Sequence, residues 1–207
     1  MKRIVLLLVL ALCAYNLQAQ TAAPKIKWLS FEQALAENAK APKFIFVDLY
    51  TDWCGRCKVM DKNTFADTVI AKYMSENFYC VKFNAEGKND VKFFGRVNKF
   101  DSLTMQNTVV MDTVVFKHDP TAGRNGTHQL AIALTDGKLS YPSFVLLDNN
   151  IQRLDIIQGY QPPPPFETML HFFVDGAYKT MSFEDFSKTF TPLSKAPVQQ
   201  QPVAPGH

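Results

Sequence analysis

The sequence predicts an α/β fold, with helices covering both faces of a central sheet. Short runs rich in aromatic and β-branched residues, at 44–49 and 79–83, are typical of buried strands. Segments with apolar residues at helical spacing, such as residues 68–77, separate these runs. Because strands that alternate with helices form parallel sheets covered on both faces, this order predicts the α/β class.

The first half of the chain contains the clearest local signals. Ser30 and Gln33 have the spacing of a capping box, and Pro42 ends the helix that follows. Asp67 is the expected N-cap of a later helix. The helices expected in this half cover residues 31–39, 54–62, 68–77 and 90–100, and the strands cover 44–49 and 79–83.

The pattern becomes less regular from about residue 101 to residue 126. Residues 108–116 are β-prone and fit either an added hairpin or an edge strand. Such an insertion either carries specificity or is a plain surface excursion. Beyond it we expect helices at 127–134, 166–174 and 182–190, strands at 141–148 and 151–158, and an extended four-proline spacer at 162–165.

Length and charge limit the domain count and the class of partner. The chain has 207 residues and a formal charge of +3, which fits one domain and gives no indication of a nucleic-acid partner. Residues 1–19 have the pattern of a secretory signal, with a charged start, an apolar core and Ala19 at the cleavage site. A lipoprotein modified at Cys13 is the less favoured alternative. Residues 20–191 then form the domain, and the Pro/Gln-rich residues 192–207 a disordered tail.

The chemistry of the chain points to Cys54-Gly55-Arg56-Cys57, at the junction of a strand and a helix. Residues three apart are neighbours on a helix, so the two cysteines can pair. Cys54 at the helix N-terminus is favoured as thiolate, the form that attacks disulfides. Half of a zinc site and a purely structural disulfide are the alternatives, although a zinc site requires two further ligands.

The segment VDLYTDWCGRC resembles the active-site segment of thioredoxin-fold oxidoreductases. With Thr64-Phe65-Ala66-Asp67 downstream, WCGRCK is similar to the thioredoxin-like domains of secreted and periplasmic bacterial proteins, including the C-terminal domain of thiol:disulfide interchange proteins. The resemblance covers roughly residues 30–100 and 140–174. It implies a three-layer α/β/α fold with a mixed central sheet, interrupted by an insertion before the strand that follows a cis-proline.

The two cysteines have separate expected roles. Cys54 is the expected nucleophile and the more exposed sulfur, and Cys57 the resolving thiol that releases the substrate. Gly55 permits close approach of a partner backbone. Arg56 places a cation near Cys54, with an effect that solvent screening reduces if the side chain points outward.

Asp48 and Lys82 are the expected proton-handling pair. A carboxylate inside an apolar strand has a raised pKa, which lets Asp48 accept a proton from Cys57 near neutral pH. The resemblance matches Asp48 to the buried acid of thioredoxin and Lys82 to the lysine beside it. The alternative is that Asp48 faces a turn and Lys82 reaches solvent.

The resemblance also implies a substrate-binding groove. It makes Pro142 the cis-proline, whose preceding residue offers its backbone to an extended substrate. That residue is Tyr141, where thioredoxin usually has Thr or Val, and it can add an aromatic contact. Trp53 is expected to pack beside the sulfurs.

We therefore expect an exported, periplasmic thiol–disulfide oxidoreductase that reduces or isomerises disulfides of exported proteins. It is expected to need no cofactor or metal beyond the redox-active Cys54–Cys57 pair. An upstream thiol donor, with a membrane donor as one option, would supply electrons. The alternatives are a non-catalytic binding module with a structural disulfide, and a metal carrier that uses the two cysteines. Cys80, in a strand-like run, is expected to be a buried core residue.

Overall fold

The computed structural model describes residues 23–101 and 106–195. The expected signal segment at 1–19 and most of the expected tail lie outside them. The strands are β1 (Trp28–Leu29), β2 (Phe44–Tyr50), β3 (Phe78–Asn84), β4 (Val91–Asp101), β5 (Gln106–Phe116), β6 (His118–Asp119), β7 (Thr127–His128), β8 (Ser143–Leu147) and β9 (Arg153–Gln158). The helices are α2 (Phe31–Lys40), α3 (Gly55–Asn63), α4 (Thr68–Asn77), α5 (Gln129–Thr135), α6 (Pro163–Val174), the 3-10 helix η1 (Ala177–Lys179) and α7 (Phe183–Thr189).

The central sheet is mixed, as the sequence predicts. Its strand order is β1-β3-β2-β8-β9. Strands β1, β3 and β2 are parallel, whereas β8 pairs antiparallel with both β2 and β9. Strand β2 is therefore the inner strand at which parallel and antiparallel pairing meet, and the residues that follow it lie near the middle of the sheet edge.

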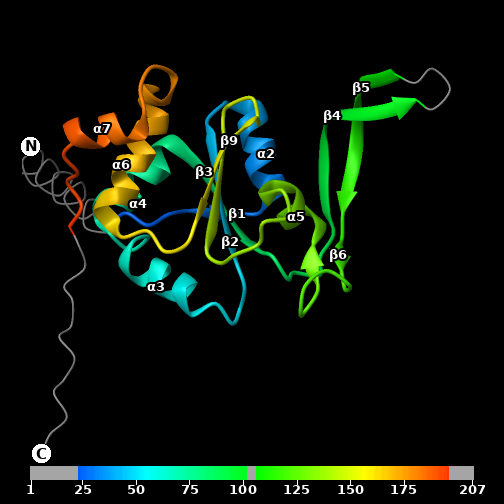
Figure 1. Ribbon diagram of the computed structural model, residues 1–207, viewed down its shortest axis with the longest axis horizontal. Helices are drawn as coiled ribbons and strands as arrows, with labels where there is room; N and C mark the ends of the chain where they lie inside the picture. Colours follow the sequence, from blue (N-terminus) through cyan, green and yellow to red (C-terminus); the bar gives the residue numbers. More distant parts are fainter. Residues whose placement is uncertain (1–22, 102–105, 196–207) are drawn as a thin grey trace, which may run out of the picture.

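Helices cover both faces of this sheet and give the expected three layers (Figure 1). Successive side chains of a strand point to opposite faces. Phe46 of β2 accordingly joins a cluster with residues of α3, α4 and α6, while its neighbours Ile45 and Val47 join a second cluster with residues of α2 and α5. Two expected N-caps are confirmed. Ser30 forms a capping box with Gln33, and Asp67 caps α4 by accepting N–H groups in the first turn of that helix.

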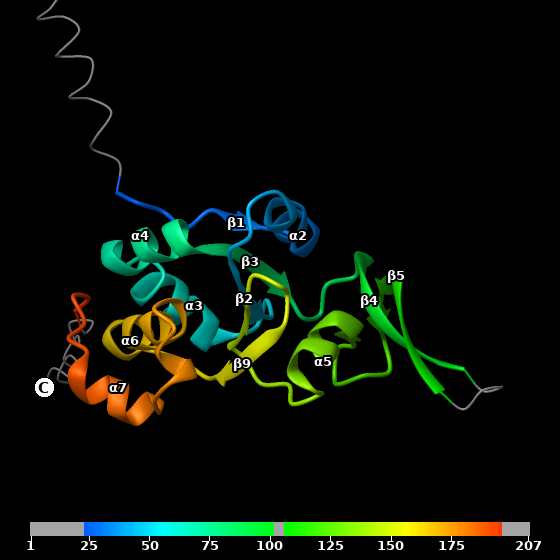
Figure 2. The same ribbon diagram turned by 90° about the horizontal axis from the view of Figure 1, so that it is seen from above.

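A long hairpin replaces one expected helix. Residues 90–100, interpreted from their sequence as a helix, form strand β4, so that prediction is wrong. The apolar residues Val91, Phe94 and Val97 recur every third position, but this stretch is also rich in β-favouring residues. Pairing with β5 over eleven consecutive positions decides the outcome. The hairpin, shown in green, extends from one end of the molecule (Figure 2).

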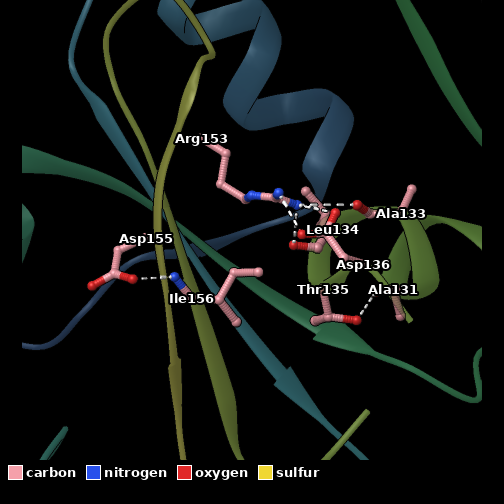
Figure 3. Close-up of polar contacts among 8 residues, drawn as sticks. All are labelled: Ala131, Ala133, Leu134, Thr135, Asp136, Arg153, Asp155 and Ile156. Atoms are coloured by element: carbon pink, nitrogen blue, oxygen red, sulfur yellow. Dashed lines mark hydrogen bonds and ion pairs between the residues drawn. The ribbon is translucent and has the colours of Figure 1, made fainter. Parts of the chain in front are cut away.

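The added segment is therefore longer than the expected 101–126, because the hairpin already begins at Val91. The chain returns to the domain through β6 and β7, which pair antiparallel, and through α5. Arg153 of β9 fixes the end of α5 (Figure 3): its guanidinium donates to both carboxylate oxygens of Asp136, at 2.9 and 2.7 Å, and to the Leu134 carbonyl at 3.1 Å.

Two predictions near the C-terminus need correction. The four-proline run is no extended spacer, because α6 begins at Pro163. Prolines suit the first turn of a helix, where N–H groups have no intrahelical acceptor. Residues 193 and 194, expected to belong to a disordered tail, are held against the domain. The buried Glu167 carboxylate accepts the N–H groups of Leu193 and Ser194, at 3.1 and 2.6 Å, which holds this segment against α6.

Candidate active site

The two cysteines lie at the N-terminus of α3, directly after the inner strand β2. They form a disulfide, with their Cα atoms 5.3 Å apart. Cys54 is the N-cap of α3, and its Sγ accepts the N–H of Cys57 at 3.1 Å. The Cys54 N–H itself donates to the Thr51 carbonyl at 3.1 Å. As the N-cap residue, Cys54 has its Sγ among the unpaired N–H groups of the first turn of α3, where a negative charge is stabilised.

The expected difference in exposure between the cysteines is wrong for this structure. Cys54 is 3% exposed and Cys57 is 5% exposed. As the N-cap, Cys54 turns its sulfur back over the first turn of α3 and toward Cys57, so both residues are covered. Open space lies instead at the next two residues. Gly55 and Arg56 are exposed, and a Cβ added at Gly55 would meet nothing within 4 Å.

Arg56 is exposed to solvent, at the second position of α3. A cation in water interacts weakly with a nearby thiolate, because the solvent and its salt screen the charge. The helix N-terminus is therefore the larger source of stabilisation for an ionised Cys54.

Asp48 and Lys82 occupy paired positions on β2 and β3, and the structure brings their side chains together. The Lys82 Nζ lies 3.3 Å from Asp48 Oδ2. Asp48 is 1% exposed, and its Oδ1 has no hydrogen-bond partner among the residues that the structure describes. Burial raises the pKa of Asp48 to about 6, while the charge of Lys82 opposes that rise. A buried carboxyl of this kind can take up and release a proton close to neutral pH.

Lys82 also contacts Asp61 of α3, which the sequence analysis did not single out. Asp61 lies four residues after Cys57, on the same helix. Lys82 therefore joins two carboxyl groups, one buried and one half-exposed. Its Nζ lies 5.0, 5.4 and 5.6 Å from the ring centroids of Trp28, Tyr50 and Phe65. A cavity of about 500 Å³ is lined by Lys82 and Asp61 among others, and it gives these two side chains access to solvent.

Trp53 and Tyr141 form the rim of the site. Their rings meet edge to face, with the centroids 6.0 Å apart. Trp53 is 61% exposed, and its Nε1 donates to Glu86 Oε1 at 3.0 Å. Burial, with the nearby charge of Glu86, raises the pKa of Tyr141 to about 12, so this phenol stays protonated at physiological pH. The peptide bond between Tyr141 and Pro142 is cis.

The site residues that the sequence analysis missed are Asp61, Glu86 and Asn125. Each is a common polar residue in a helix or loop, and only contacts with distant residues give it a place in the site. Within residues 23–101 and 106–195, no group of three His, Cys, Asp or Glu side chains is arranged to hold a metal ion. The same ranges contain no helix with the length and apolar character of a membrane span. Cys80 is buried, as expected, and burial raises the pKa of its thiol.

Fold and site together define the class: a thioredoxin fold with a disulfide between cysteines three positions apart, at the strand–helix junction. A model of the thioredoxin-like family matches residues 27–148, which is more than half of the chain. The chain belongs to the thioredoxin-like family.

Comparison with individual proteins agrees with this membership. The thiol:disulfide interchange protein DsbD of Pseudoalteromonas atlantica is 43% identical over 49 residues, which cover 24% of this chain and 8% of the relative. DsbD of Pectobacterium atrosepticum is 43% identical over 37 residues, covering 18% of this chain and 6% of the relative. The chain thus matches less than a tenth of the length of these relatives. A thioredoxin from Thermus thermophilus, 13% identical with a TM-score of 0.50, covers 76% of this chain and 94% of its own, which shows the fold alone.

Proposed function

We propose that this protein exchanges disulfides with exported protein substrates, and that it acts in the reducing or isomerising direction. The observation that carries the proposal is the Cys54–Cys57 disulfide at the start of α3, combined with a buried carboxyl of pKa about 6 on the preceding strand β2. A structural disulfide has no need of a proton acceptor, whereas a dithiol that must ionise in turn does.

The reaction begins from the reduced dithiol. The Cys54 thiolate attacks one sulfur of a substrate disulfide, forming a mixed disulfide and expelling one substrate thiolate. Cys57 then loses its proton to Asp48 and attacks Cys54 Sγ, which expels the second substrate thiolate. Two electrons have passed to the substrate, and Cys54–Cys57 is left as the disulfide seen here. Return to the dithiol requires two electrons from an upstream thiol donor, with a membrane donor as one option.

Lys82 has a supporting role in this scheme. Its ammonium group lies against the Asp48 carboxylate and keeps the pKa of that group from rising further. Asp48 is thus ionised in a large fraction of molecules at pH 7, ready to accept the proton of Cys57.

The substrate would lie across the exposed side of the site. Gly55 leaves room for a partner backbone, and Arg56 beside it is exposed. Tyr141 and Pro142 would offer backbone groups to an extended peptide, in the manner of an added strand. The exposed ring of Trp53 would cover one side of that peptide. Export, expected from residues 1–19, would bring the site to periplasmic proteins, where disulfides persist.

Reduction of insulin with a supplied thiol tests the proposal directly. The parent protein should accelerate it, and Cys54→Ser should lower turnover by roughly 10³-fold or more, because the attacking sulfur is gone. Cys57→Ser should retain the first step and accumulate a mixed disulfide, which mass spectrometry detects. A Cys54→Ser variant as active as the parent would rule the proposal out.

The burial of the disulfide favours a second candidate function, a binding module in which Cys54–Cys57 is only structural. At 3% and 5% exposure, neither cysteine is open to a large partner unless the rim moves. The two candidates differ in their reduction potentials. A value near about −270 mV, as in thioredoxin, supports the exchange reaction, whereas a disulfide below about −300 mV that glutathione does not reduce supports the structural role.

A further inference from the structure

We propose that Asn125 is a positioning residue for disulfide exchange. It holds Glu86, which in turn orients the Trp53 indole at the rim. The inserted segment, residues 91–128, thereby takes part in selecting protein substrates. This inference rests on the proposed function and adds to it the part of the chain that discriminates between substrates.

The Glu86 carboxylate is shared between the active-site loop and the inserted segment. The Trp53 indole N–H donates to Oε1 at 3.0 Å. The Asn125 amide donates to the same carboxylate, with Nδ2 3.1 Å from Oε1 and 3.3 Å from Oε2. A Glu side chain has three rotatable bonds and rarely keeps one orientation on its own. With Asn125 on one side and Trp53 on the other, Glu86 is confined, and so is the indole.

The loop that carries Glu86 is anchored by the same inserted segment. The His128 N–H donates to the Ala85 carbonyl at 2.7 Å, and the Ala85 N–H donates to the Tyr50 carbonyl at 2.8 Å, at the end of β2. The fully buried His128 ring accepts the Leu130 N–H at Nδ1, so its Nε2 carries the proton that binds the Asn89 carbonyl at 3.0 Å. Hydrogen bonds to His128 therefore hold both ends of residues 85–89, and Glu86 lies between these two contacts.

A glycine sets the position of Asn125. Gly126 has a φ of +78°, and a Cβ on it would lie 2.3 Å from His118 Nε2 and 3.0 Å from the Asp119 carbonyl oxygen. A side chain there would have to displace the His118 imidazole and would press against the Asp119 carbonyl of β6. Only glycine therefore allows the chain to turn so closely against this strand and to present Asn125 to Glu86.

Trp53 has the exposure and the position that substrate contact requires. Its ring is 61% exposed, next to Cys54 in sequence, and its edge-to-face contact with Tyr141 leaves much of its surface open. A folded protein approaching the disulfide must pass this ring, whereas a small linear disulfide needs only the sulfurs. Holding the indole in place therefore affects protein substrates and leaves the chemical step unchanged.

The test compares two substrates in the full-length protein. In Asn125→Ala, the KM for insulin should rise by roughly 3- to 10-fold, the effect of a misplaced aromatic contact, with kcat nearly unchanged. The rate with bis(2-hydroxyethyl) disulfide should equal that of the parent. In NMR spectra, the indole N–H resonance of Trp53, assigned with Trp53→Phe, should move, because it loses a fixed acceptor.

Two further variants complete the experiment. Asn125→Asp sets a second carboxylate against Glu86 and should raise the insulin KM at least as much. Thr121→Ala, in the same segment but bonded to Asp119, should change neither KM nor the indole resonance. An unchanged insulin KM in both Asn125 variants, or an equal loss with both substrates, would overturn the inference. If the parent itself fails to reduce insulin, the proposed function fails, and an unmoved indole resonance would refute the positioning contact separately.

Discussion

Two carboxyl groups of the site, those of Asp48 and Glu86, lie in contrasting surroundings. Asp48 is buried within β2, faces the Lys82 ammonium and has one oxygen without a partner. Glu86 follows β3, is partly exposed and accepts hydrogen bonds from neutral N–H groups, those of Trp53 and Asn125. Burial raises the pKa of Asp48 into the range where it carries protons. Under the proposed function, the buried acid accepts a proton from Cys57 and the partly exposed acid holds the Trp53 side chain.

The sharpest test of this contrast is the activity of Asp48→Asn. An amide cannot accept the proton of Cys57, so insulin turnover at pH 7 should fall by about 10²-fold. In the parent, Asp48 must be ionised to act, so activity should rise as the pH passes through about 6. A kinetic profile from pH 5 to 8 should show this rise in the parent and lack it in Asp48→Asn.

Glu86→Gln is the matched control, because it makes the same chemical change in the exposed carboxyl. It should keep the rise in activity near pH 6 and act on the KM for insulin. Loss of that rise in Glu86→Gln, or its survival in Asp48→Asn, would break the division of roles between the two acids.

The stability of Asp48→Asn should change in the opposite sense from its activity. Because the folded-state pKa of Asp48 is raised from 3.8 to about 6, the folded protein holds this proton more tightly than the unfolded chain. The resulting stability is fully present below about pH 4 and is lost as the pH rises through about 6. The neutral amide avoids this loss, so its free energy of unfolding at pH 7 should exceed that of the parent by up to about 3 kcal/mol.

Urea unfolding of both proteins at pH 4 and pH 7 measures this difference. The gain should be present at pH 7 and nearly absent at pH 4. A gain of equal size at both values would mean that the substitution acts through packing, and that the ionised carboxylate does not cost stability.

In the segment that contacts Glu86, Gly126→Ala should have the next largest effect. Its positive φ and the overlap of the new Cβ with His118 should lower the free energy of unfolding by about 1–3 kcal/mol. Gly137→Ala is the control, since Gly137 also has a positive φ but a Cβ there meets nothing within 4 Å. It should cost less and leave the Trp53 indole resonance in place, whereas Gly126→Ala should shift it.

The smallest effect is expected at Arg153, which contacts neither acid. Arg153→Ala removes the guanidinium group that binds Asp136 and the end of α5. The pair is partly exposed, so the loss should be about 0.5–1 kcal/mol and should shrink further in high salt. Thermal unfolding at low and high salt measures it. A loss of several kcal/mol would show that α5, and the inserted segment before it, depend on this one contact.

The parts of the molecule that local patterns determine could be predicted from the sequence. Strand β2, its junction with α3 and the cap of α2 follow from neighbouring residues, and the structure confirms them. Asp48 and Lys82 were matched through a family resemblance, and their contact follows from the parallel register of β2 and β3.

What the sequence did not predict depends on contacts between distant segments. Residues 90–100 carry a helix-like spacing, and only pairing with β5 makes them a strand. Glu86 and Asn125 are 39 residues apart and meet because the inserted segment folds back on the domain. The exposure of Cys54 was misjudged because an N-cap sulfur turns toward its own helix.

The β4–β5 hairpin is closed in register from end to end, so Val91 and Phe116 stand directly opposite each other. The chain therefore leaves the domain and re-enters it at almost the same point, whatever the length of the arm between. Val91, Phe93 and Phe116 at the base of the arm belong to or pack against the core of the domain. Trimming the arm beyond them by equal numbers of residues on its two strands should leave the geometry of the segment behind it intact. We therefore expect the outer part of the hairpin to be exchangeable as a module, with Asn125 and its contact to Glu86 left in place.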